Sequence, residues 1–308
     1  MSVIGIETSN YTTSIAWFDG QDGENCSRLL PVKQGELGLR QSDAVFAHIK
    51  SLPELSGRLF SHIKRENPVT AVGVSTRPRA VEGSYMPCFM VGYSHAKLLS
   101  DVLRVPLIEV SHQQGHVAAS LWSAGHLELM DEPHLAWHLS GGTTELLLVE
   151  PDGKNVKCTR IGGTTDISAG QLIDRTGQLL ELPFPSGKHV DALSQTAELK
   201  EVFKVKCANM EFSLSGVQNK VQQFHQKNGS PEETAAYALR CVAGAVEQAT
   251  RQALKAYPGL RVVFSGGVAS NSMLRKVIAP LDPIFCAPQF STDNAMGVAV
   301  LTSRSLEG

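Results

Sequence analysis

The sequence predicts an α/β protein made of two halves that are built alike. Residues 3–20 read as an apolar strand, a hydroxyl-rich turn, a second strand and a tight Asp-Gly turn, which is the pattern of a β-hairpin. Residues 134–153 repeat this order, with Ser140-Gly141-Gly142 in the turn. Segments with helical periodicity separate the strands along the chain. The repeated order favours two α/β units with a cleft between them.

Composition excludes several classes of protein. The chain has 308 residues, of which 42% are hydrophobic and 19% charged, as in an ordinary globular protein. The formal net charge is −2, so any nucleic-acid contact requires a local basic patch or a partner. No apolar run approaches the roughly 20 residues of a membrane span, and because a strand begins at Val3 we expect no signal peptide. The six cysteines form no CxxC pair, which predicts reduced thiols and a cytoplasmic location.

In the first half, the pattern predicts a hairpin, two further strands and two helices before the segment that carries the histidines. We expect strands at 3–9 and 13–18, a helix at 43–64 broken or kinked near Pro53, a strand at 70–75, a helix at 86–103 and a strand at 105–110.

In the second half, helices dominate the prediction. We expect strands at 134–139, 145–149 and 261–264, helices at 166–180, 190–199, 214–226 and 232–256, a helix ending at Ile278, and a final helix of small residues at 295–303.

Two histidines follow the strand that ends at Val110. Ser111 is expected to cap a helix, which places His112 and His116 four residues apart on one face of its first turn. Two imidazoles at this spacing can share a metal ion if a third ligand arrives from elsewhere. The helix N-terminus disfavours protonated imidazole, so both rings are expected to be neutral. Histidines at this spacing also occur as a partly exposed pair without a metal.

Asp293 is the candidate for the third ligand, and its position allows two interpretations. It stands just before the final helix, where aspartate is a frequent N-cap, or it completes a His-His-Asp metal site. The spacing along the chain does not decide between them. A zinc peptidase would need glutamate directly after the first histidine, but Gln113 cannot act as a general base.

Two Ser-Gly-Gly turns suggest phosphate binding. Ser140-Gly141-Gly142 and Ser265-Gly266-Gly267 each follow a buried strand, and the second is expected to run directly into a helix. Neither matches the dinucleotide-binding or Walker patterns. Asp174 and Asp191 flank a Pro-Gly loop, where they are either solvated helix charges or acceptors for ribose hydroxyls.

The order of these motifs resembles the TsaD family, the tRNA adenosine threonylcarbamoyltransferases once labelled O-sialoglycoprotein endopeptidases. The motifs that carry the resemblance are Gly5-Ile6-Glu7-Thr8-Ser9, His112 with His116, Leu139-Ser140-Gly141-Gly142, Ala169-Gly170 with Asp174, Phe184-Pro185-Ser186-Gly187 with Asp191, Phe212-Ser213-Leu214-Ser215-Gly216, Gly266-Gly267-Val268-Ala269-Ser270-Asn271, and Thr292-Asp293-Asn294.

The resemblance implies an actin-like ATPase fold, in which two ribonuclease-H-like lobes surround a nucleotide cleft. It implies an N-terminal lobe at 1–110 with the C-terminal helix 291–308 packed on it, a metal-binding helix and connection at 111–133, and a C-terminal lobe at 134–290. One divalent ion, iron or zinc, would be held by His112, His116 and Asp293. The adenylate (AMP, ADP or ATP, or the substrate threonylcarbamoyl-AMP) would be held by Leu139, Ser140, Gly141, Gly142, Thr143, Asp174, Gly187, Asp191, Gly266, Gly267 and Asn271. Ser140 and Thr143 are candidates to lie near the acyl group.

The resemblance also implies partners. A mildly acidic chain would meet tRNA through partner proteins, in a homo-oligomer or in a hetero-oligomer with TsaB- and TsaE-like proteins, and no membrane is expected.

Several positions depart from the family pattern. The family continues Glu-Thr-Ser with Cys-Asp-Glu-Thr, whereas this chain reads Asn10-Tyr11-Thr12-Thr13, so both acids are gone. The family's His in SGGHT is Thr143, a family Glu is Gln171, and its Gly-Pro-Gly loop reads Arg77-Pro78-Arg79. These changes favour a second hypothesis, a paralogue that binds metal and nucleotide but catalyses a different carbamoyl-type transfer or serves as a non-catalytic partner. A metallopeptidase and a small-molecule kinase of the same fold are further alternatives.

Overall fold

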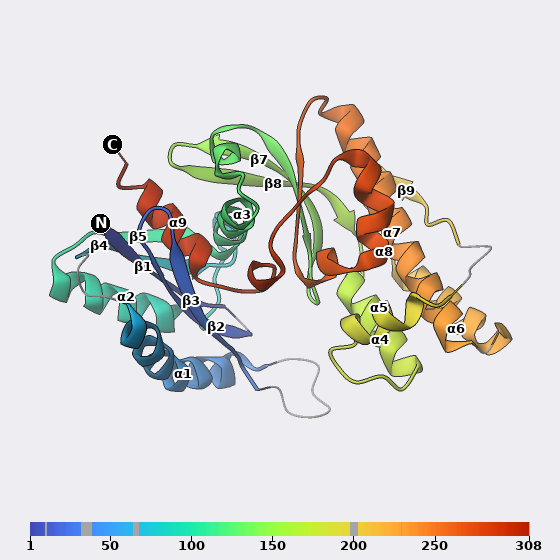
Figure 1. The fold of residues 1–308 in the computed structure, drawn as a ribbon, viewed down its shortest axis with the longest axis horizontal. Helices are drawn as coiled ribbons and strands as arrows, with labels where there is room; N and C mark the ends of the chain where they lie inside the picture. Colours follow the sequence, from blue (N-terminus) through green and yellow to red (C-terminus); the bar gives the residue numbers. More distant parts are fainter. Residues whose placement is uncertain (10, 32–38, 64–67, 198–202, 229, 308) are drawn as a thin grey trace. The chain divides into compact units, whose positions relative to one another are not determined.

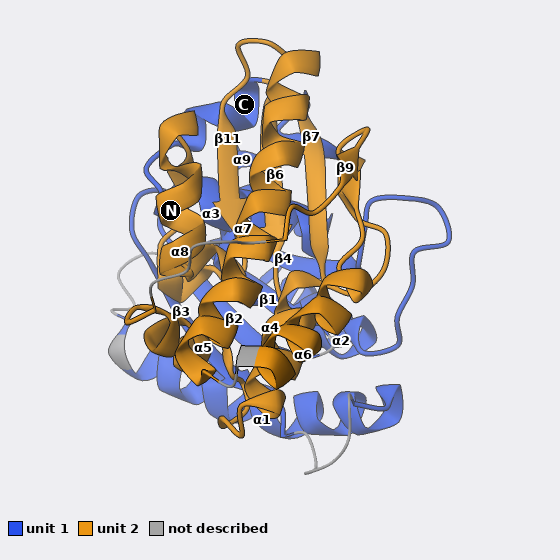
Figure 2. Cartoon of the chain, turned by 90° about the vertical axis from the view of Figure 1, so that its right-hand side faces the viewer, with its two compact units in different colours: residues 1–132, 150–158, 293–308 blue, residues 133–149, 159–292 orange. Residues whose placement is uncertain are grey.

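The computed structural model describes residues 1–9, 11–31, 39–63, 68–197, 203–228 and 230–307. The chain forms two compact units, shown in Figure 2. Unit 1 contains Met1–Glu132, Glu150–Cys158 and Asp293–Gly308, and unit 2 contains Pro133–Val149 and Thr159–Thr292. The three-part division expected from the sequence stays a prediction, and each unit is described below by itself.

Unit 1 is built on a sheet with the strand order β3-β2-β1-β4-β5 (Figure 1). Strands β1, β4 and β5 run parallel to one another, whereas β2 and β3 are antiparallel to their neighbours. The strands are β1 Ser2–Thr8, β2 Thr12–Phe18, β3 Gly23–Leu29, β4 Val69–Arg77 and β5 Leu107–Ser111. The helices are α1 Gln41–His62, α2 Phe89–Leu103, α3 His112–Ser123, the 3₁₀ helix η1 Leu127–Asp131, and α9 Met296–Arg304.

Successive side chains of β1 and β4 point to opposite faces of this sheet. On one face, apolar side chains pack together with those of α1 and α2; they include Ile4, Ile6, Val72, Val74, Leu55, Leu59 and Ala96. On the other face, glycine allows α9 to lie directly on the sheet. A Cβ on Gly5 would lie 2.6 Å from the carbonyl oxygen of Ala295, and one on Gly73 would lie 3.0 Å from Cβ of Thr302. Helix α9 also packs on α3, which carries the histidines.

Unit 2 contains the core of a second sheet, with the order β12-β11-β6-β7-β8-β10-β9. Its strands are β6 His134–Leu139, β7 Thr144–Asp152, β8 Asn155–Thr164, β9 Cys207–Ala208, β10 Glu211–Phe212, β11 Val262–Ser265 and β12 Ile284–Phe285. Its helices are α4 Ala169–Leu179, α5 Gly187–Ser194, α6 Ser215–Asn228, α7 Pro231–Ala256 and α8 Ser272–Ile278, with 3₁₀ helices η2 Gly267–Ser270, η3 Ala279–Leu281 and η4 Pro288–Phe290.

Helix α7 forms the centre of the unit 2 core. Its buried face is rich in alanine, so the helix lies close to its neighbours α4, α5, α6 and α8. Trp137 on β6 is fully buried, and its indole Nε1 donates a 2.9 Å hydrogen bond to Oγ1 of Thr250 on α7. This bond satisfies the one polar atom of a large apolar side chain.

The helices and the main strands predicted from the sequence are confirmed, with ends shifted by a few residues. Helix α1 is not broken at Pro53, which lies inside it. Lys64 of the first predicted helix, and Glu198 and Leu199 of the predicted helix 190–199, lie outside the described residues. Strands β3, β8, β9, β10 and β12 were not predicted. In the part of the chain that the structure describes, no helix combines the length and apolar character needed to span a membrane.

The side chain of Asp166 ties together two segments of unit 2. Its Oδ1 accepts a 2.8 Å hydrogen bond from the backbone N–H of Leu214, and Oδ2 accepts one of 2.6 Å from Oγ of Ser215. Burial raises the pKa of this carboxyl, but the hydrogen bonds from Ser213, Ser215 and Leu214 outweigh that effect and lower the pKa from 3.8 to about 2.

This lowered pKa predicts a loss of stability in acid. Because the folded pKa lies below the unfolded one, the bonds contribute stability that is complete above about pH 4 and is lost as the pH falls to about 2. The Asp166→Asn variant is therefore expected to be less stable than wild type at pH 6, with a difference that shrinks by pH 2. Urea unfolding at both pH values measures this, and a difference that does not change with pH would contradict it.

Candidate functional site

The start of α3 is fixed by a capping box. Oγ of Ser111 accepts a 3.3 Å hydrogen bond from the backbone N–H of Gln114, and Oε1 of Gln114 accepts one of 2.9 Å from the backbone N–H of Ser111. Nε2 of Gln114 also donates to the carbonyl oxygen of Val156 at 2.8 Å. The predicted cap at Ser111 is thus confirmed, and the first helical turn, which begins at His112, is held in a defined orientation.

The side chains of His112, His116 and Asp293 converge in unit 1, and we call them the His–His–Asp cluster. Nε2 of His112 lies 3.0 Å from Nε2 of His116, and Oδ1 of Asp293 lies 3.2 Å from Nε2 of His116 and 3.7 Å from Nε2 of His112. Three ligands at about 2.0–2.1 Å from a tetrahedral ion stand about 3.3 Å apart. Among the described residues, these three therefore form a group that could hold one metal ion.

Asp293 does not cap the last helix. Helix α9 begins at Met296 with Ala295 as its N-cap, and no side chain makes the cap bond. Instead, Oδ1 of Asn294 accepts a 3.1 Å hydrogen bond from the backbone N–H of Met296. The interpretation of Asp293 as an N-cap is therefore wrong, because the neighbouring asparagine serves the helix start while the carboxylate lies beside the two imidazoles.

The contact between α3 and α9 brings the aspartate to the histidines. The two helices meet at Gly115 and Gly297, and a Cβ on Gly297 would lie 1.7 Å from the carbonyl oxygen of Gly115. A side chain at position 297 would push the helices apart, whereas a Cβ on Gly115 would lie 3.5 Å from Cγ2 of Val298, an ordinary contact. Gly115 lies between the two histidines, and Gly297 lies four residues after Asp293.

A second carboxylate, Glu7, was not predicted as part of the site. It is the last residue but one of β1, its side chain is 1% exposed, and Oε2 lies 3.2 Å from Nδ1 of His112. The residue belongs to the motif Gly5–Ser9, which is part of the family resemblance, but no role was predicted for it. Its position follows from the parallel pairing of β1, β4 and β5, which brings the end of β1 to the edge where α3 begins.

Glu7 changes the charge of His112. Burial alone lowers the pKa of this imidazole, but the charge of Glu7, its hydrogen bond and the charge of Asp293 together raise the pKa to about 9. The expectation that both rings stay neutral is therefore wrong for His112. The carboxylates outweigh the helix N-terminus, so an ion that binds Nε2 must displace a proton.

Other polar atoms gather at the same sheet edge. Among the described residues, Oε1 of Glu7, Oγ of Ser9, Oγ of Ser75, Oγ1 of Thr76 and Nε of Arg77 are buried and have no hydrogen-bond partner. Buried polar atoms are normally bonded, and ligands of α/β proteins bind at the carboxyl ends of parallel strands. These five atoms lie at the carboxyl ends of β1 and β4, so this edge of unit 1 is where a polar ligand would satisfy them.

The predicted nucleotide-binding residues all belong to unit 2. Ser140 and Thr143 close the turn between β6 and β7, since Oγ of Ser140 accepts a 3.0 Å hydrogen bond from the backbone N–H of Thr143. Oγ of Ser168, the cap of α4, donates to the carbonyl oxygen of Gly141 at 2.6 Å. A Cβ on Gly170 would lie 2.5 Å from the carbonyl oxygen of Ser140, so the turn packs closely on the start of α4.

The second glycine turn lies beside the first. Gly266 has a φ of +89°, and a Cβ there would lie 2.2 Å from the carbonyl oxygen of Leu139. The turn does not run directly into an α-helix as predicted, because the 3₁₀ helix Gly267–Ser270 intervenes. Asn271 then caps α8, with Oδ1 accepting a 3.0 Å bond from the N–H of Leu274.

The two predicted carboxylates of unit 2 have protein partners. Oδ1 of Asp174 accepts a 2.8 Å bond from the N–H of Ser186, next to Gly187 at the start of α5, and burial outweighs this bond and raises the pKa of the carboxyl. Asp191 accepts from the backbone N–H and the hydroxyl of Ser272 at 3.1 and 2.7 Å. Asp191 is thus brought to Asn271 and Ser272, and neither acid is a freely solvated helix charge.

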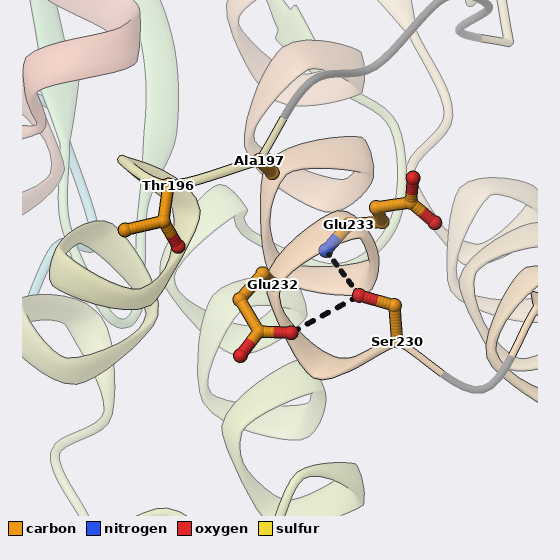
Figure 3. A pocket seen from close by; sticks show the side chains of 5 residues that line it. All are labelled: Thr196, Ala197, Ser230, Glu232 and Glu233. Carbon is orange, nitrogen blue, oxygen red and sulfur yellow. Dashed lines mark hydrogen bonds between the residues drawn. The ribbon is translucent and has the colours of Figure 1, made fainter.

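A hollow elsewhere in unit 2 does not include any predicted site residue. It is lined by Thr196, Ala197, Ser230, Glu232 and Glu233 (Figure 3). Oγ of Ser230 accepts from the backbone N–H of Glu233 and donates to Oε2 of Glu232. These groups cap α7, so we assign the hollow no ligand.

A comparison of the sequence with family models finds one described as TsaD, tRNA N6-adenosine threonylcarbamoyltransferase, which matches residues 36–300. A protein named tRNA N6-adenosine threonylcarbamoyltransferase from Carboxydothermus hydrogenoformans is 31% identical over 96% of this chain and 90% of its own length. One of the same name from Thermosipho africanus is 31% identical over 97% of this chain and 93% of its own.

Solved structures with low sequence identity share the fold. Full-length HypF in its phosphate- and nucleotide-bound form has a TM-score of 0.65 at 15% identity, covering 100% of this chain and 47% of HypF. Component A of (R)-2-hydroxyglutaryl-CoA dehydratase from Acidaminococcus fermentans has a TM-score of 0.58 at 13% identity, with both chains covered completely. A ROK hexokinase from Thermus thermophilus has a TM-score of 0.55 at 14% identity, covering 100% of this chain and 99% of its own. The predicted actin-like fold is confirmed.

Proposed function

This chain belongs to the TsaD family, and on that premise we propose that it transfers a threonylcarbamoyl group from threonylcarbamoyl-AMP to the N6 amine of the tRNA adenosine adjacent to the anticodon. The relatives that match over most of the chain carry the name of this activity. The observation that carries the proposal is the convergence of His112, His116 and Asp293.

The residues of unit 1 fit a divalent ion. Two imidazole nitrogens and a carboxylate oxygen are ligands that iron and zinc accept, and their separations match one ion. An ion held by these three residues would supply Lewis-acid chemistry to the carbamoyl group and to the leaving phosphate. The unpartnered polar atoms at the ends of β1 and β4 would contact the acyl group, which offers several hydrogen-bonding groups of its own.

The residues of unit 2 fit the adenylate. The adjacent turns at Leu139–Thr143 and at Gly266–Gly267 would hold its phosphate through backbone N–H groups. Asp174, Gly187, Asp191 and Asn271 would contact the nucleoside, as the resemblance implies. The acceptor adenine would have to leave its stack in the tRNA for its exocyclic amine to reach the acyl group.

Partner proteins belong to the proposal. With a net charge of −2 the chain as a whole does not attract tRNA, so we propose that TsaB- and TsaE-like proteins help to recruit it. The cytoplasmic location expected from the sequence fits an enzyme acting on tRNA.

A second candidate is a paralogue with a different carbamoyl-type transfer. The side chains that favour it replace family residues: Thr143 stands for a histidine, Tyr11 for an acid, and Arg77 and Arg79 for two glycines. Asn10, the neighbouring replacement, lies outside the described residues. Arg77 brings a cation with a buried, unpartnered Nε to the sheet edge beside α3, which would alter the choice of acyl group.

A reconstituted transfer assay separates the two candidates. The purified chain is incubated with Zn²⁺ or Fe²⁺, threonylcarbamoyl-AMP, tRNA and partner proteins, and nucleosides from the digested tRNA are analysed by mass spectrometry. The relative from Carboxydothermus hydrogenoformans serves as the positive control. Threonylcarbamoyladenosine formed by both proteins supports the proposal. If only the relative forms threonylcarbamoyladenosine, while this chain still binds metal and AMP, the result would favour the paralogue.

A further inference from the structure

Glu7 lies behind His112 in unit 1 and has no role in the transfer as described so far. Its side chain is 1% exposed, and Oε2 lies 3.2 Å from Nδ1 of His112. A buried carboxylate is costly unless it has a partner. In the described part of the chain His112 forms an ion pair with it, while Oε1 has no hydrogen-bond partner. The burial of Glu7 is therefore explained by the imidazole.

The two nitrogens of His112 face different groups. Nε2 points to the other members of the cluster, 3.0 Å from Nε2 of His116 and 3.7 Å from Oδ1 of Asp293. Nδ1 faces Glu7. The Phe89 ring stands at 64° to the imidazole, with 6.1 Å between centroids, and packs against it. An imidazole that binds an ion through Nε2 carries its proton on Nδ1, and a carboxylate beside Nδ1 selects that tautomer.

We propose that Glu7 is a positioning residue: it accepts the Nδ1–H of His112 and so fixes the tautomer and ring orientation that present Nε2 to a divalent ion. This inference rests on the metal site of the proposed function. It assigns a role to the Glu of the Glu7-Thr8-Ser9 motif at the end of β1. It also accounts for the burial of Glu7 near the end of β1, beside His112.

The Glu7→Gln variant tests the role by metal affinity. Loss of a group that orients a metal ligand costs about 10–100-fold in affinity, so we expect Zn²⁺ binding to weaken by that factor in competition with a chromophoric chelator. The visible spectrum of the Co²⁺-loaded variant is expected to shift, because the ring no longer has a fixed orientation. Glu24→Gln is the matched control, since it removes one exposed carboxylate from β3 of the same unit, and it is expected to bind Zn²⁺ as wild type does.

The tautomer of His112 distinguishes the two roles, because it would not change if Glu7 only stabilised the fold. In ¹⁵N-histidine-labelled, Zn²⁺-loaded wild type, NMR is expected to show His112 protonated at Nδ1, with this signal lost or broadened by exchange in Glu7→Gln. An affinity for Zn²⁺ in Glu7→Gln within about twofold of wild type, well short of the expected factor, would overturn the inference and leave the proposed function intact. So would a wild-type His112 protonated at Nε2, even if the variant failed to fold. Absence of Zn²⁺ binding by wild type would overturn both.

Discussion

The His116→Ala variant is expected to bind Zn²⁺ more than about 100-fold more weakly than wild type, and to lose transfer activity with it. A group that merely orients a ligand is worth about 10–100-fold in affinity, and His116 supplies a ligand atom directly. Its Nε2 is also the atom closest to both other members of the cluster, 3.0 Å from Nε2 of His112 and 3.2 Å from Oδ1 of Asp293. Isothermal titration and metal analysis of the purified variant measure the change.

His126→Ala provides the matched control for this substitution. His126 also belongs to unit 1, but its Nδ1 lies 2.9 Å from Oε1 of Glu128 on the protein surface, away from the cluster. We expect its metal content and activity to equal those of wild type. Unchanged Zn²⁺ affinity in His116→Ala would contradict this prediction, because it would mean that the ion binds outside the His–His–Asp cluster.

The Gly297→Ala variant is expected to be destabilised by about 3 kcal/mol or more, beyond the usual cost of overpacking a core. The added Cβ would lie 1.7 Å from the carbonyl oxygen of Gly115 and 2.9 Å from the backbone nitrogen of Ala119. Both atoms belong to the backbone of α3, so the clash is relieved only by moving one helix. Such a shift displaces Asp293 from the histidines, and metal affinity is expected to fall as well.

The sign of this effect is diagnostic, because glycine-to-alanine changes inside ordinary helices stabilise them by about 1 kcal/mol. Gly57→Ala on α1 is the control, since within the described chain a Cβ there meets no atom within 4 Å. Urea unfolding followed by the fluorescence of Trp17 and Trp122, both in unit 1, measures the two variants. A Gly297→Ala variant as stable as Gly57→Ala would contradict the close contact between α3 and α9.

Much of the secondary structure was predictable because local pattern determines it. The capped start of α3 follows from Ser111 at the end of a buried strand, and four-residue spacing alone places His112 and His116 together. The missed strands lack such a signal. Strand β3 is half exposed and has no alternation of apolar residues, while β9, β10 and β12 contain two residues each and exist only through their sheet partners.

The remainder of the site depends on tertiary contacts that no local pattern encodes. Asp293 reaches the histidines because α9 meets α3 at Gly115 and Gly297, and these two glycines lie 182 positions apart in the numbering of the chain. Glu7 reaches His112 through the order of the parallel strands. Its charge then reverses the expected neutrality of the ring, since a helix N-terminus is weaker than a buried carboxylate at 3.2 Å.

The central claim is that one divalent ion binds between two imidazoles and a carboxylate of unit 1. Anomalous diffraction from crystals of the Zn²⁺-loaded protein, recorded on both sides of the zinc edge, tests it most directly. The account predicts a single strong peak about 2.0–2.2 Å from Nε2 of His112, Nε2 of His116 and a carboxylate oxygen of Asp293. A zinc peak that lies elsewhere in the protein, with none at these three atoms, would contradict it.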